Sequence, residues 1–359
     1  RRIFAGSITS GQIATGAHVR FLPSGKSSQI ASIEGYAIAS RDAAAVGEAV
    51  GFTLTEQIYV KPGELMVLEG DATPLITQRF RATVFWMGRA PLIRERRYVL
   101  KLGSAKVPVA LREVRRVIDA SAVSTEATKA QLERHDVGEV VFETLRPVAC
   151  DLASSFAATG RFVIVDHYDI AGCGVVLDTV EGGESLLERQ VREREFSWRA
   201  GAVDRATRTA RNGHQGRFVL FVTEPGSPPQ HAAFAEQLAA RIESELFESG
   251  KQTYFLSIAN LRHRLASREE HVERLGEQAR VLTDAGLLFL SVLTEAEVSE
   301  LSALATLNRP AELFVVAVGS SAGPAVKGTQ VRPEGELDEA RRRVLSSLLA
   351  EEILLEYQI

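Results

Sequence analysis

The residues with the clearest chemical potential follow a predicted buried strand, Arg217–Thr223 (RFVLFVT). A turn over 224–230 (EPGSPPQ) comes next, and an amphipathic helix is expected to begin near His231. In nucleotide-binding proteins a turn in this place reads G-x-x-x-x-G-K-[ST], and its glycine backbone and lysine bind phosphate. Here adjacent prolines remove backbone N–H donors, and no lysine opens the helix. The pattern predicts the frame of a phosphate site in which Gly226, Ser227 and His231 are the remaining candidate contacts.

Other side chains that could bind metals or catalyse a reaction are dispersed along the sequence. No HExxH-like spacing joins the scattered histidines, which include His18, His135, His167, His214 and His231. Cys150 and Cys173 have no metal-ligand spacing. Asp166–Asp169 (DHYD) could suggest catalysis, but an isolated histidine beside carboxylates is commonly only hydrogen-bonded. We predict no metal site and no catalytic residue, and we expect Trp86 and Trp198 to pack or to lie at an interface.

Residues 1 to about 178 carry short alternating runs separated by glycine and proline, which is typical of an all-β region. Strands are expected at 3–9, 18–22, 29–33, 49–54, 64–68, 80–86, 97–102, 106–114, 138–144 and 160–166. Regularly spaced strands usually close into barrels or sandwiches. Pro74 lies between two groups of them, so we predict one β-barrel over 1–73 and a second over 74–178.

The later part of the chain alternates strands with helices. A charged segment over 179–200 is interpreted as a linker or an exposed helix. Beyond it we expect helices at 231–248, 267–284 and 337–357, and further strands at 251–258, 287–293 and 313–318. Repeated βα units imply a parallel sheet covered on both faces. The predicted fold class is therefore multidomain, with two all-β barrels followed by an α/β parallel-sheet domain over 201–359.

Composition restricts the classes of partner. The chain has 359 residues, of which 45% are hydrophobic and 25% charged, as in a globular protein of two or three domains. A net charge of −4 gives no support to nucleic-acid binding. No apolar run approaches the roughly 18 residues of a membrane span, and no signal peptide is visible. We expect a cytoplasmic protein without nucleic-acid or membrane partners, and the abrupt start suggests a piece of a longer polypeptide.

The β-region contains strings that point to a known family. They are 4–11 (FAGSITSG), 15–16 (TG), 19–26 (VRFLPSGK), 86–87 (WM), 91–92 (PL), 98–103 (YVLKLG) and 160–166 (GRFVIVD). The first barrel resembles domain 2 of the translational GTPases related to elongation factor Tu, and the second resembles domain 3. Within that class the strings are most similar to the GTPase subunit of sulfate adenylyltransferase.

The α/β region carries a second resemblance. Residues 256–265 read LSIANLRHRL, where adenylylsulfate kinases have L-D-G-D-N-V-R-H-G-L. Residues 268–286 read REEHVERLGEQARVLTDAG, which is similar to R-E-E-N-I-R-R-x-x-E-V-A-K-L-x-x-D-A-G of the same family. In many bacteria this kinase is fused to the GTPase subunit, so the domain order agrees. The resemblance implies a P-loop-kinase-like domain over 201–359 with a degenerate P-loop.

Several residues to which the resemblance assigns catalysis are replaced. Residues 231–233 (HAA) stand where the family has a lysine and a magnesium-binding Ser or Thr. Residues 257–259 (SIA) replace an acidic pair, and His271 and Glu273 replace the Asn and Arg that contact substrate. Loss of these groups together should abolish phosphoryl transfer.

Four basic residues of the family pattern survive, namely Arg262, His263, Arg268 and Arg274. They could form a remnant anion site that still binds a nucleotide sulfate. Alternatively they are helix-surface charges left from an ancestral kinase, which is the interpretation that we favour.

The resemblance implies the C-terminal part of a sulfate adenylyltransferase GTPase-subunit-like protein in sulfate assimilation. Its degenerate kinase domain would have a structural, docking or regulatory role, and whether the chain is an enzyme stays open. The implied partners are the adenylyltransferase catalytic subunit and an upstream GTPase domain in cis. No N-K-x-D string occurs, so GTP and Mg²⁺ would act only through that domain, and no cofactor is expected here. The alternatives are residual adenylylsulfate kinase activity and translation-factor-like macromolecule binding.

Overall fold

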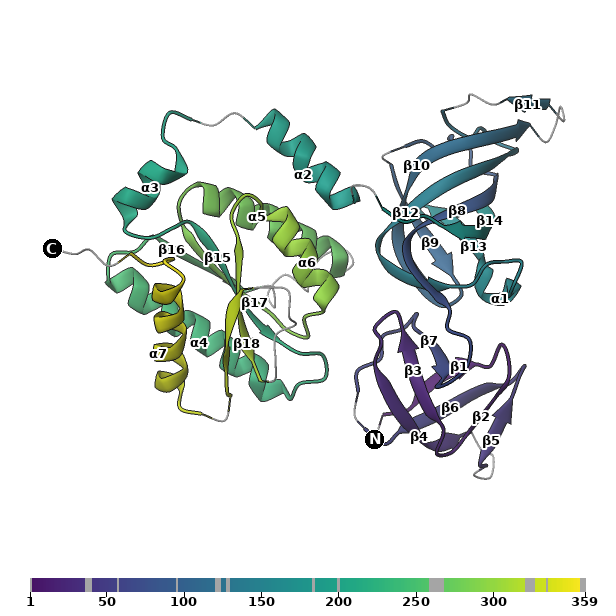
Figure 1. Cartoon of the computed structure of the whole chain (residues 1–359), viewed down its shortest axis with the longest axis horizontal. Helices are drawn as coiled ribbons and strands as arrows, with labels where there is room; N and C mark the ends of the chain where they lie inside the picture. The colour runs from purple at the N-terminus through teal and green to yellow at the C-terminus, as the bar shows by residue number, and fades with distance from the viewer. Residues whose placement is uncertain are drawn as a thin grey trace. The chain divides into compact units, whose positions relative to one another are not determined.

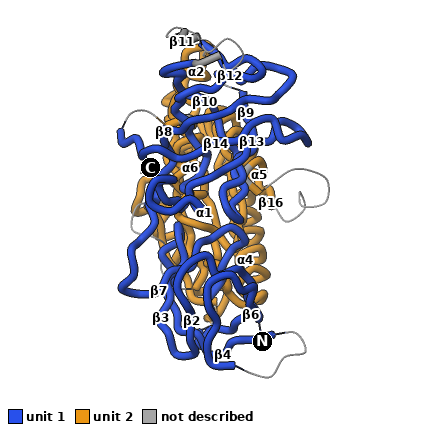
Figure 2. The backbone as a smooth tube through the Cα atoms, turned by 90° about the vertical axis from the view of Figure 1, so that its right-hand side faces the viewer, with its two compact units in different colours: residues 1–183 blue, residues 184–359 orange. Residues whose placement is uncertain are grey.

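The computed structural model describes the chain except for residues 1, 36–40, 57, 95, 120–123, 127–129, 183–184, 199–200, 258–267, 320–326, 334 and 356–359. The chain divides into two units, residues 1–183 and residues 184–359 (Figure 2). The predicted fold class is confirmed, because β-rich sheets that include a closed barrel precede a parallel α/β sheet (Figure 1).

The first β-domain encloses a small aromatic core. A five-stranded sheet has the order β1-β6-β4-β3-β7, and β2 pairs with β5. Phe4, Phe21 and Phe52 pack with their ring centroids 5.8 to 6.5 Å apart. The strands are β1 (Phe4–Ser7), β2 (Gln12–Ala14), β3 (His18–Leu22), β4 (Ser27–Glu34), β5 (Ala43–Ala45), β6 (Ala49–Leu54) and β7 (Leu65–Leu68).

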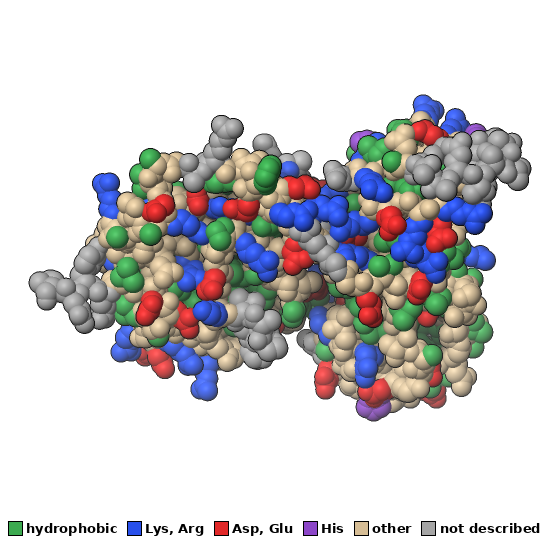
Figure 3. Space-filling view, turned by 45° about the horizontal axis from the view of Figure 1, so that its top comes forward, with side chains coloured by type: hydrophobic (Ala, Val, Ile, Leu, Met, Phe, Trp, Pro, Cys, Tyr) green, Lys and Arg blue, Asp and Glu red, His purple; other side chains and the backbone are tan. Residues whose placement is uncertain are grey.

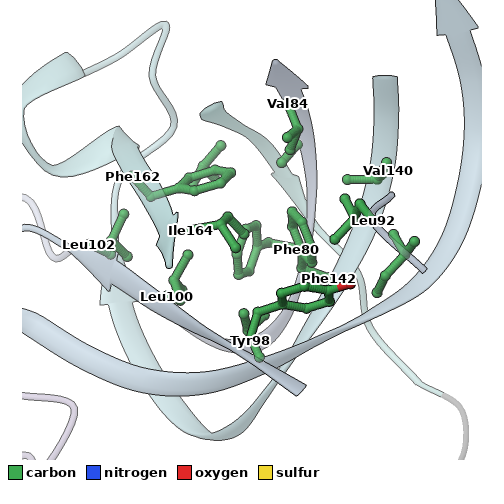
Figure 4. Close-up of a cluster of buried hydrophobic side chains, with 14 of the residues drawn as sticks. Phe80, Val84, Leu92, Tyr98, Leu100, Leu102, Val140, Phe142, Phe162 and Ile164 are labelled. Atoms are coloured by element: carbon green, nitrogen blue, oxygen red, sulfur yellow. The ribbon is translucent and has the colours of Figure 1, made fainter. Parts of the chain in front are cut away.

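The second β-domain is a closed six-stranded barrel. Its strands follow the order β10-β12-β8-β14-β13-β9, and pairing of β9 with β10 closes the ring. Phe80, Phe142 and Phe162 meet in its core with centroids 5.7 to 6.0 Å apart (Figure 4). The elements are β8 (Leu75–Trp86), β9 (Arg97–Leu102), β10 (Ala105–Asp119), β11 (Ser124–Glu126), β12 (Asp136–Cys150), α1 (Ala157–Gly160), β13 (Arg161–Asp166) and β14 (Asp169–Thr179).

The α/β unit is built on a five-stranded parallel sheet of order β16-β17-β15-β18-β19. The strands are β15 (Arg217–Thr223), β16 (Thr253–Ser257), β17 (Leu288–Leu293), β18 (Leu313–Val318) and β19 (Gly328–Val331). The helices are α2 (Leu186–Ser197), α3 (Arg205–Asn212), α4 (Pro229–Glu248), α5 (Arg268–Asp284), α6 (Val298–Leu307) and α7 (Leu337–Ala350). The strand that precedes the turn at 224–230 is thus the central strand.

Helices cover both faces of this sheet (Figure 1). Alternate residues of β15 explain why: Phe221 packs into one core with α4 and α7, and Leu220 packs into another with α5 and α6. The amphipathic helix predicted at 231–248 turns its apolar side to the sheet, since Leu238 and Ile242 are fully buried. Strands buried on both faces require such continuous apolar runs.

The closing helix is shorter than the sequence pattern predicts. It ends at Ala350 instead of Tyr357. Glu352 adopts a positive φ of 54°, which interrupts helical geometry. The chain then turns so that Ile353 and Leu354 are buried, and Leu354 forms a β-bridge with His214. Tertiary burial of this apolar pair therefore overrides the helical periodicity.

The sequence pattern did not predict eight further elements, namely β2, β5, β11, α1, β14, α3, α6 and β19. The segment expected to be a linker or an exposed helix contains α2. Basic and acidic side chains are interspersed on the face seen in Figure 3. Within the described residues, no helix is long and apolar enough to cross a membrane.

Candidate phosphate site

The turn between β15 and α4 forms hydrogen bonds within its own backbone. The Ser227 N–H donates to the Glu224 carbonyl at 3.1 Å, and Gly226 supplies the positive φ of 84° that the turn needs. Pro228 and Pro229 precede and open the helix. No side chain in the described part of the chain caps this helix. The N-terminus of α4 therefore offers fewer N–H donors to an anion than a glycine-rich loop would.

His231 occupies the position where a lysine would bind phosphate. Its N–H donates to the Pro228 carbonyl at 2.9 Å, within the first turn of α4. Its ring lies against Gly319, the residue that follows β18, since a Cβ added to Gly319 would be 3.3 Å from Nδ1. The imidazole therefore packs across the carboxyl ends of the central strands, where it fills space instead of extending toward solvent.

The loop after β17 is hydrogen-bonded to the end of β15. The Glu295 N–H donates to Thr223 Oγ1 at 3.0 Å, and the Ala296 N–H donates to the Thr223 carbonyl at 2.8 Å. In open parallel sheets, ligands bind at this edge, where successive connections leave toward opposite faces. Here α4 follows β15 on one face and α6 follows β17 on the other. The loop after β17 thus takes up hydrogen-bonding groups that a ligand would need.

Arg268, one of the four basic residues that match the family pattern, is hydrogen-bonded to the same loop. Its Nη2 donates to the carbonyls of Thr294 and Glu295, both at 2.9 Å, and to Glu300 Oε2 at 2.9 Å. Burial alone would lower the pKa of Arg268, but the hydrogen bonds and charge of Glu300 outweigh it and raise the pKa. Glu300 also accepts the Glu297 N–H at 2.9 Å. Arg268 therefore joins α5 to the start of α6.

Of the other basic candidates, Arg274 is within the described residues, and it does not lie beside Arg268. Arg274 is exposed on α5, and a separation of six residues turns the two side chains about 240° apart around the helix axis. Arg262 and His263 lie outside the described residues. Ser257, at a position where the family has an acidic residue, donates its hydroxyl to Glu236 of α4 at 3.0 Å.

The loops after β15 and β17 carry acidic side chains. Glu224 follows β15, and Glu295 and Glu297 follow β17, all at the carboxyl edge of the sheet. Like charge opposes phosphate binding, so these two loops are electrostatically unlike a phosphate loop. Among the described residues, no group of three His, Cys, Asp or Glu side chains is arranged to hold a metal ion.

Two places in the barrel that the sequence singled out, the turn at Asp166 and His167 and the side chain of Trp86, have contacts that stabilise the fold. Arg96 Nη2 donates to both oxygens of Asp166, at 2.6 and 2.8 Å, which fixes the turn that carries His167. Trp86 is fully buried and donates Nε1–H to the Ala90 carbonyl at 2.8 Å. The prediction that Trp86 is a packing residue is confirmed.

Thr223, Glu295 and Glu300, which hold the loop after β17 in place, were not predicted from the sequence. The local sequence signal for part of this arrangement was the pair Glu297 and Glu300. Their spacing of three is that of a capping box, in which two side chains bond to the backbone at a helix N-terminus. Their connection to Arg268 and to β15 depends on tertiary contacts.

The barrel is the part of the chain that matches a family model. Residues 79–177 match the family model described as GTP-eEF1A C-terminal domain-like. This range runs from β8 to β14 and covers the closed barrel.

Longer matches extend into the α/β unit. The bifunctional enzyme NodQ of Rhizobium sp. (strain N33) is 29% identical over 80% of this chain and 43% of its own length. The bifunctional enzyme CysN/CysC of Xylella fastidiosa (strain Temecula1 / ATCC 700964) is 25% identical over 80% of this chain and 45% of its own. Sulfate adenylyltransferase subunit 1 of Alteromonas mediterranea (strain DSM 17117 / CIP 110805 / LMG 28347 / Deep ecotype) is 30% identical over 55% of this chain and 42% of its own.

The chain is thus distantly homologous to these sulfate-activation proteins, and it spans less than half of the length of each. Among solved structures, that of Sup35 complexed with GDP matches 50% of this chain and 44% of its own, with 18% identity and a TM-score of 0.46.

Proposed function

We propose that this chain is part of a sulfate-activating protein whose kinase-like domain no longer transfers phosphoryl groups. In this proposal the β-barrels extend over 1–73 and 74–178, a connecting segment over 179–200, and the kinase-like domain over 201–359. The domain would serve as a structural, docking or regulatory module. The observation that carries the proposal is the state of the turn at 224–230, where phosphate-binding groups are replaced or already engaged.

The replaced groups are those on which phosphoryl transfer depends. A phosphate loop needs a fixed positive charge and a hydroxyl that binds magnesium. His231 supplies no permanent charge and packs on Gly319, and Ala232 has no hydroxyl. Removal of a single transition-state contact commonly costs about 2.7–4 kcal/mol, and several are changed here. We therefore expect no measurable transfer.

The contacts around the turn at 224–230 support the proposal that the domain has kept its packed fold and lost its activity. Thr223 and Arg268 both bind the loop after β17, so two groups that could face a nucleotide stabilise the fold instead. Recovery of activity would require this loop to move as well as the missing side chains to be restored.

Incubation of the chain with ATP, Mg²⁺ and adenylylsulfate tests the proposal directly, with an active adenylylsulfate kinase as positive control. We expect no phosphorylated product from the wild type. We also expect none from the double variant His231→Lys/Ala232→Ser, because Pro228 and Pro229 still lack N–H donors and the loop at 295–296 is still hydrogen-bonded to Thr223. Product formation by the wild type would establish the alternative, residual kinase activity.

For the barrels we propose a coupling role. A GTPase domain in cis would bind GTP and Mg²⁺, and the barrels would transmit its nucleotide-dependent motion to the adenylyltransferase catalytic subunit. This part rests on the homology to sulfate adenylyltransferase subunit 1. Affinity capture with a tagged chain should recover the catalytic subunit from a mixture of purified proteins. Absence of binding by the full-length protein would contradict the coupling role.

A further inference from the structure

A hollow of about 610 Å³ lies in the α/β unit at the edge of the sheet opposite to the phosphate loop. β15 begins there at Arg217 and ends at Thr223 beside the loop, so the two places are roughly 20 Å apart at about 3.3 Å per strand residue. Polar side chains that line the hollow are Arg205, Thr209, Gln215, Arg217, Thr283 and Glu312. Its volume is in the range of about 300–1,000 Å³ that holds small organic molecules.

Helix α3 forms one wall of the hollow and is fixed in place by polar contacts. Ala206, Thr209 and Ala210, which share one helical face, line the space. Asn212 Nδ2 donates to the Gly286 carbonyl at 3.1 Å. No residue of α3, which is described in full, is buried. The helix thus borders a cavity instead of completing a core.

The opposite wall of the hollow includes closely packed backbone segments. A Cβ at Gly216 would lie 2.1 Å from the Thr283 carbonyl oxygen, so the backbones before β15 and at the end of α5 already touch. These close contacts hold the strand entrance and the turn after α5 together. The hollow is therefore bordered on this side by tightly packed backbone.

Two guanidinium donors of residues that line this hollow lack acceptors. Arg205 Nη2 and Arg217 Nε are both buried, and neither has a hydrogen-bond partner among the described residues. A buried charged donor without an acceptor costs more than a neutral one, so such groups usually meet water or an anion. Arg217 Nη1 and Nη2 are used, by Glu312 at 2.7 Å and by Gln215 at 2.9 Å. In the conformation described, both nitrogens are covered by neighbouring atoms, so an acceptor in the hollow would bond to them once the two guanidinium groups turn toward it.

Arg205 is partly buried among charges of both signs. Burial and the neighbouring charge of Arg280 lower the pKa of Arg205, and Arg217 contributes in the same direction. Asp284 and Glu195 oppose this effect; the Asp284 carboxylate is 3.8 Å from Arg205 Nε. Glu312, more than half exposed at the rim, is the carboxylate that lines the hollow itself. A ligand with negative charge would relieve the mutual repulsion of the arginines.

We propose that Arg205 and Arg217 bind the oxyanion of a small phosphate or sulfate monoester in this hollow. Fork-shaped guanidinium groups suit tetrahedral oxyanions, because they donate two hydrogen bonds in one plane. The volume exceeds that of a bare anion, so the organic part of the ester would lie against Ala206, Ala210 and Leu355. The site is independent of the phosphate loop and of whether that loop is active.

The full chain with ¹⁵N-labelled arginine provides the test. The Arg217 Nε–H resonance, assigned by its loss in Arg217→Lys, should shift saturably on titration with inorganic phosphate or with ribose 5-phosphate. Ribose, which lacks the oxyanion, should leave it unchanged. A response to phosphate and ribose 5-phosphate no larger than that to NaCl of equal ionic strength would overturn the proposal, and so would an equal shift with ribose.

Two variants are expected to change the affinity for ribose 5-phosphate in opposite directions, whereas damage to the fold would lower it in both. Arg205→Met should weaken ribose 5-phosphate binding by about tenfold or more, as expected for loss of a charge-assisted hydrogen bond. Glu312→Gln should strengthen it severalfold, because it removes a repelling carboxylate and releases Arg217 Nη1. Arg211→Met, on the exposed side of the same helix, is the matched control and should bind as the wild type does. Unchanged affinity in both Arg205→Met and Glu312→Gln would refute the assignment.

Discussion

Cys150 ends β12 with its side chain fully buried in the barrel core, whereas Cys173 is only half-buried on β14. Burial, with a smaller contribution from the charge of Asp151, raises the pKa of the Cys150 thiol to about 11. The thiolate is the reactive form of cysteine, so Cys150 should be inert at ordinary pH for two reasons, low ionisation and lack of access.

We predict that a thiol reagent at about pH 8 labels the native chain once, at Cys173, and the denatured chain twice. Mass spectrometry of the labelled protein measures the count. The variant Cys173→Ser should show no fast labelling in the native state. Two rapid labels on native wild type would contradict the burial of Cys150.

At the scale of elements, α2 is held against the α/β unit by a buried guanidinium. Arg280 of α5 donates from Nε and Nη2 to the two oxygens of Glu195, both at 2.9 Å, and its guanidinium lies 4.6 Å from the centre of the Trp198 ring. Arg194 adds bonds to Glu277 and to the Leu307 carbonyl, each at 2.9 Å. The hydrogen bonds to Arg280 lower the pKa of Glu195.

Glu195→Gln should loosen α2, because it leaves the charge of the nearly fully buried Arg280 only partly compensated by Asp284. We expect a loss of about 1–3 kcal/mol in the stability of α2 docking. Weaker docking of α2 would be measured as faster tryptic cleavage of the variant at Arg189 and Arg192. Glu193→Gln, an exposed position on the same helix, should be cleaved at the wild-type rate.

A buried histidine connects three elements of the α/β unit. His214 Nε2 accepts the Gln252 N–H at 3.0 Å, so the proton resides on Nδ1, which donates to the Gln215 carbonyl at 3.1 Å. The backbone of His214 also bridges to Leu354 after α7. Burial, opposed by the bond to Gln215 and assisted by Lys251, lowers the pKa of His214.

The lowered pKa predicts acid sensitivity of the α/β unit. Below about pH 6.5 the unfolded chain binds a proton at His214 that the folded unit resists, so the free energy of unfolding should fall as pH falls. Denaturant titrations followed by Trp198 fluorescence at about pH 8 and about pH 5.5 would measure the difference. In His214→Asn this dependence should shrink; an equal dependence in both proteins would assign it to other groups.

For the whole molecule, each unit has its own buried clusters, and the two tryptophans are divided between them. Trp86→Phe removes the hydrogen bond to Ala90 and part of the edge-on contact with Tyr98, whose ring centroid is 5.6 Å away. We expect the barrel to lose about 1–3 kcal/mol of stability.

The remaining tryptophan of that variant reports only on the α/β unit. We predict an unchanged midpoint for the Trp198 transition, while circular dichroism detects earlier unfolding of the barrel. Trp198→Phe gives the complementary measurement, since Trp86 then reports the barrel. A parallel shift of both transitions in Trp86→Phe would instead indicate one cooperative unit.

The sequence by itself determined those features that depend on neighbours along the chain. The apolar runs at 217–223, 288–293 and 313–318 predicted the central strands, because strands buried on both faces need continuous hydrophobic residues. The periodicities within 231–248 and 268–284 predicted α4 and α5 in the same way. The prolines and the missing lysine of the turn were also visible without a structure.

Only the tertiary structure decided what fills the altered site and what lies at the other edge of the sheet. His231 and Gly319 are 88 positions apart, and Thr223 and Glu295 are 72 apart, so no local pattern could pair them. The hollow brings together residues 205–217, 283–286, 310–312 and 355. Its two arginines look like surface charges in sequence, and burial by distant segments is what leaves their donors without acceptors.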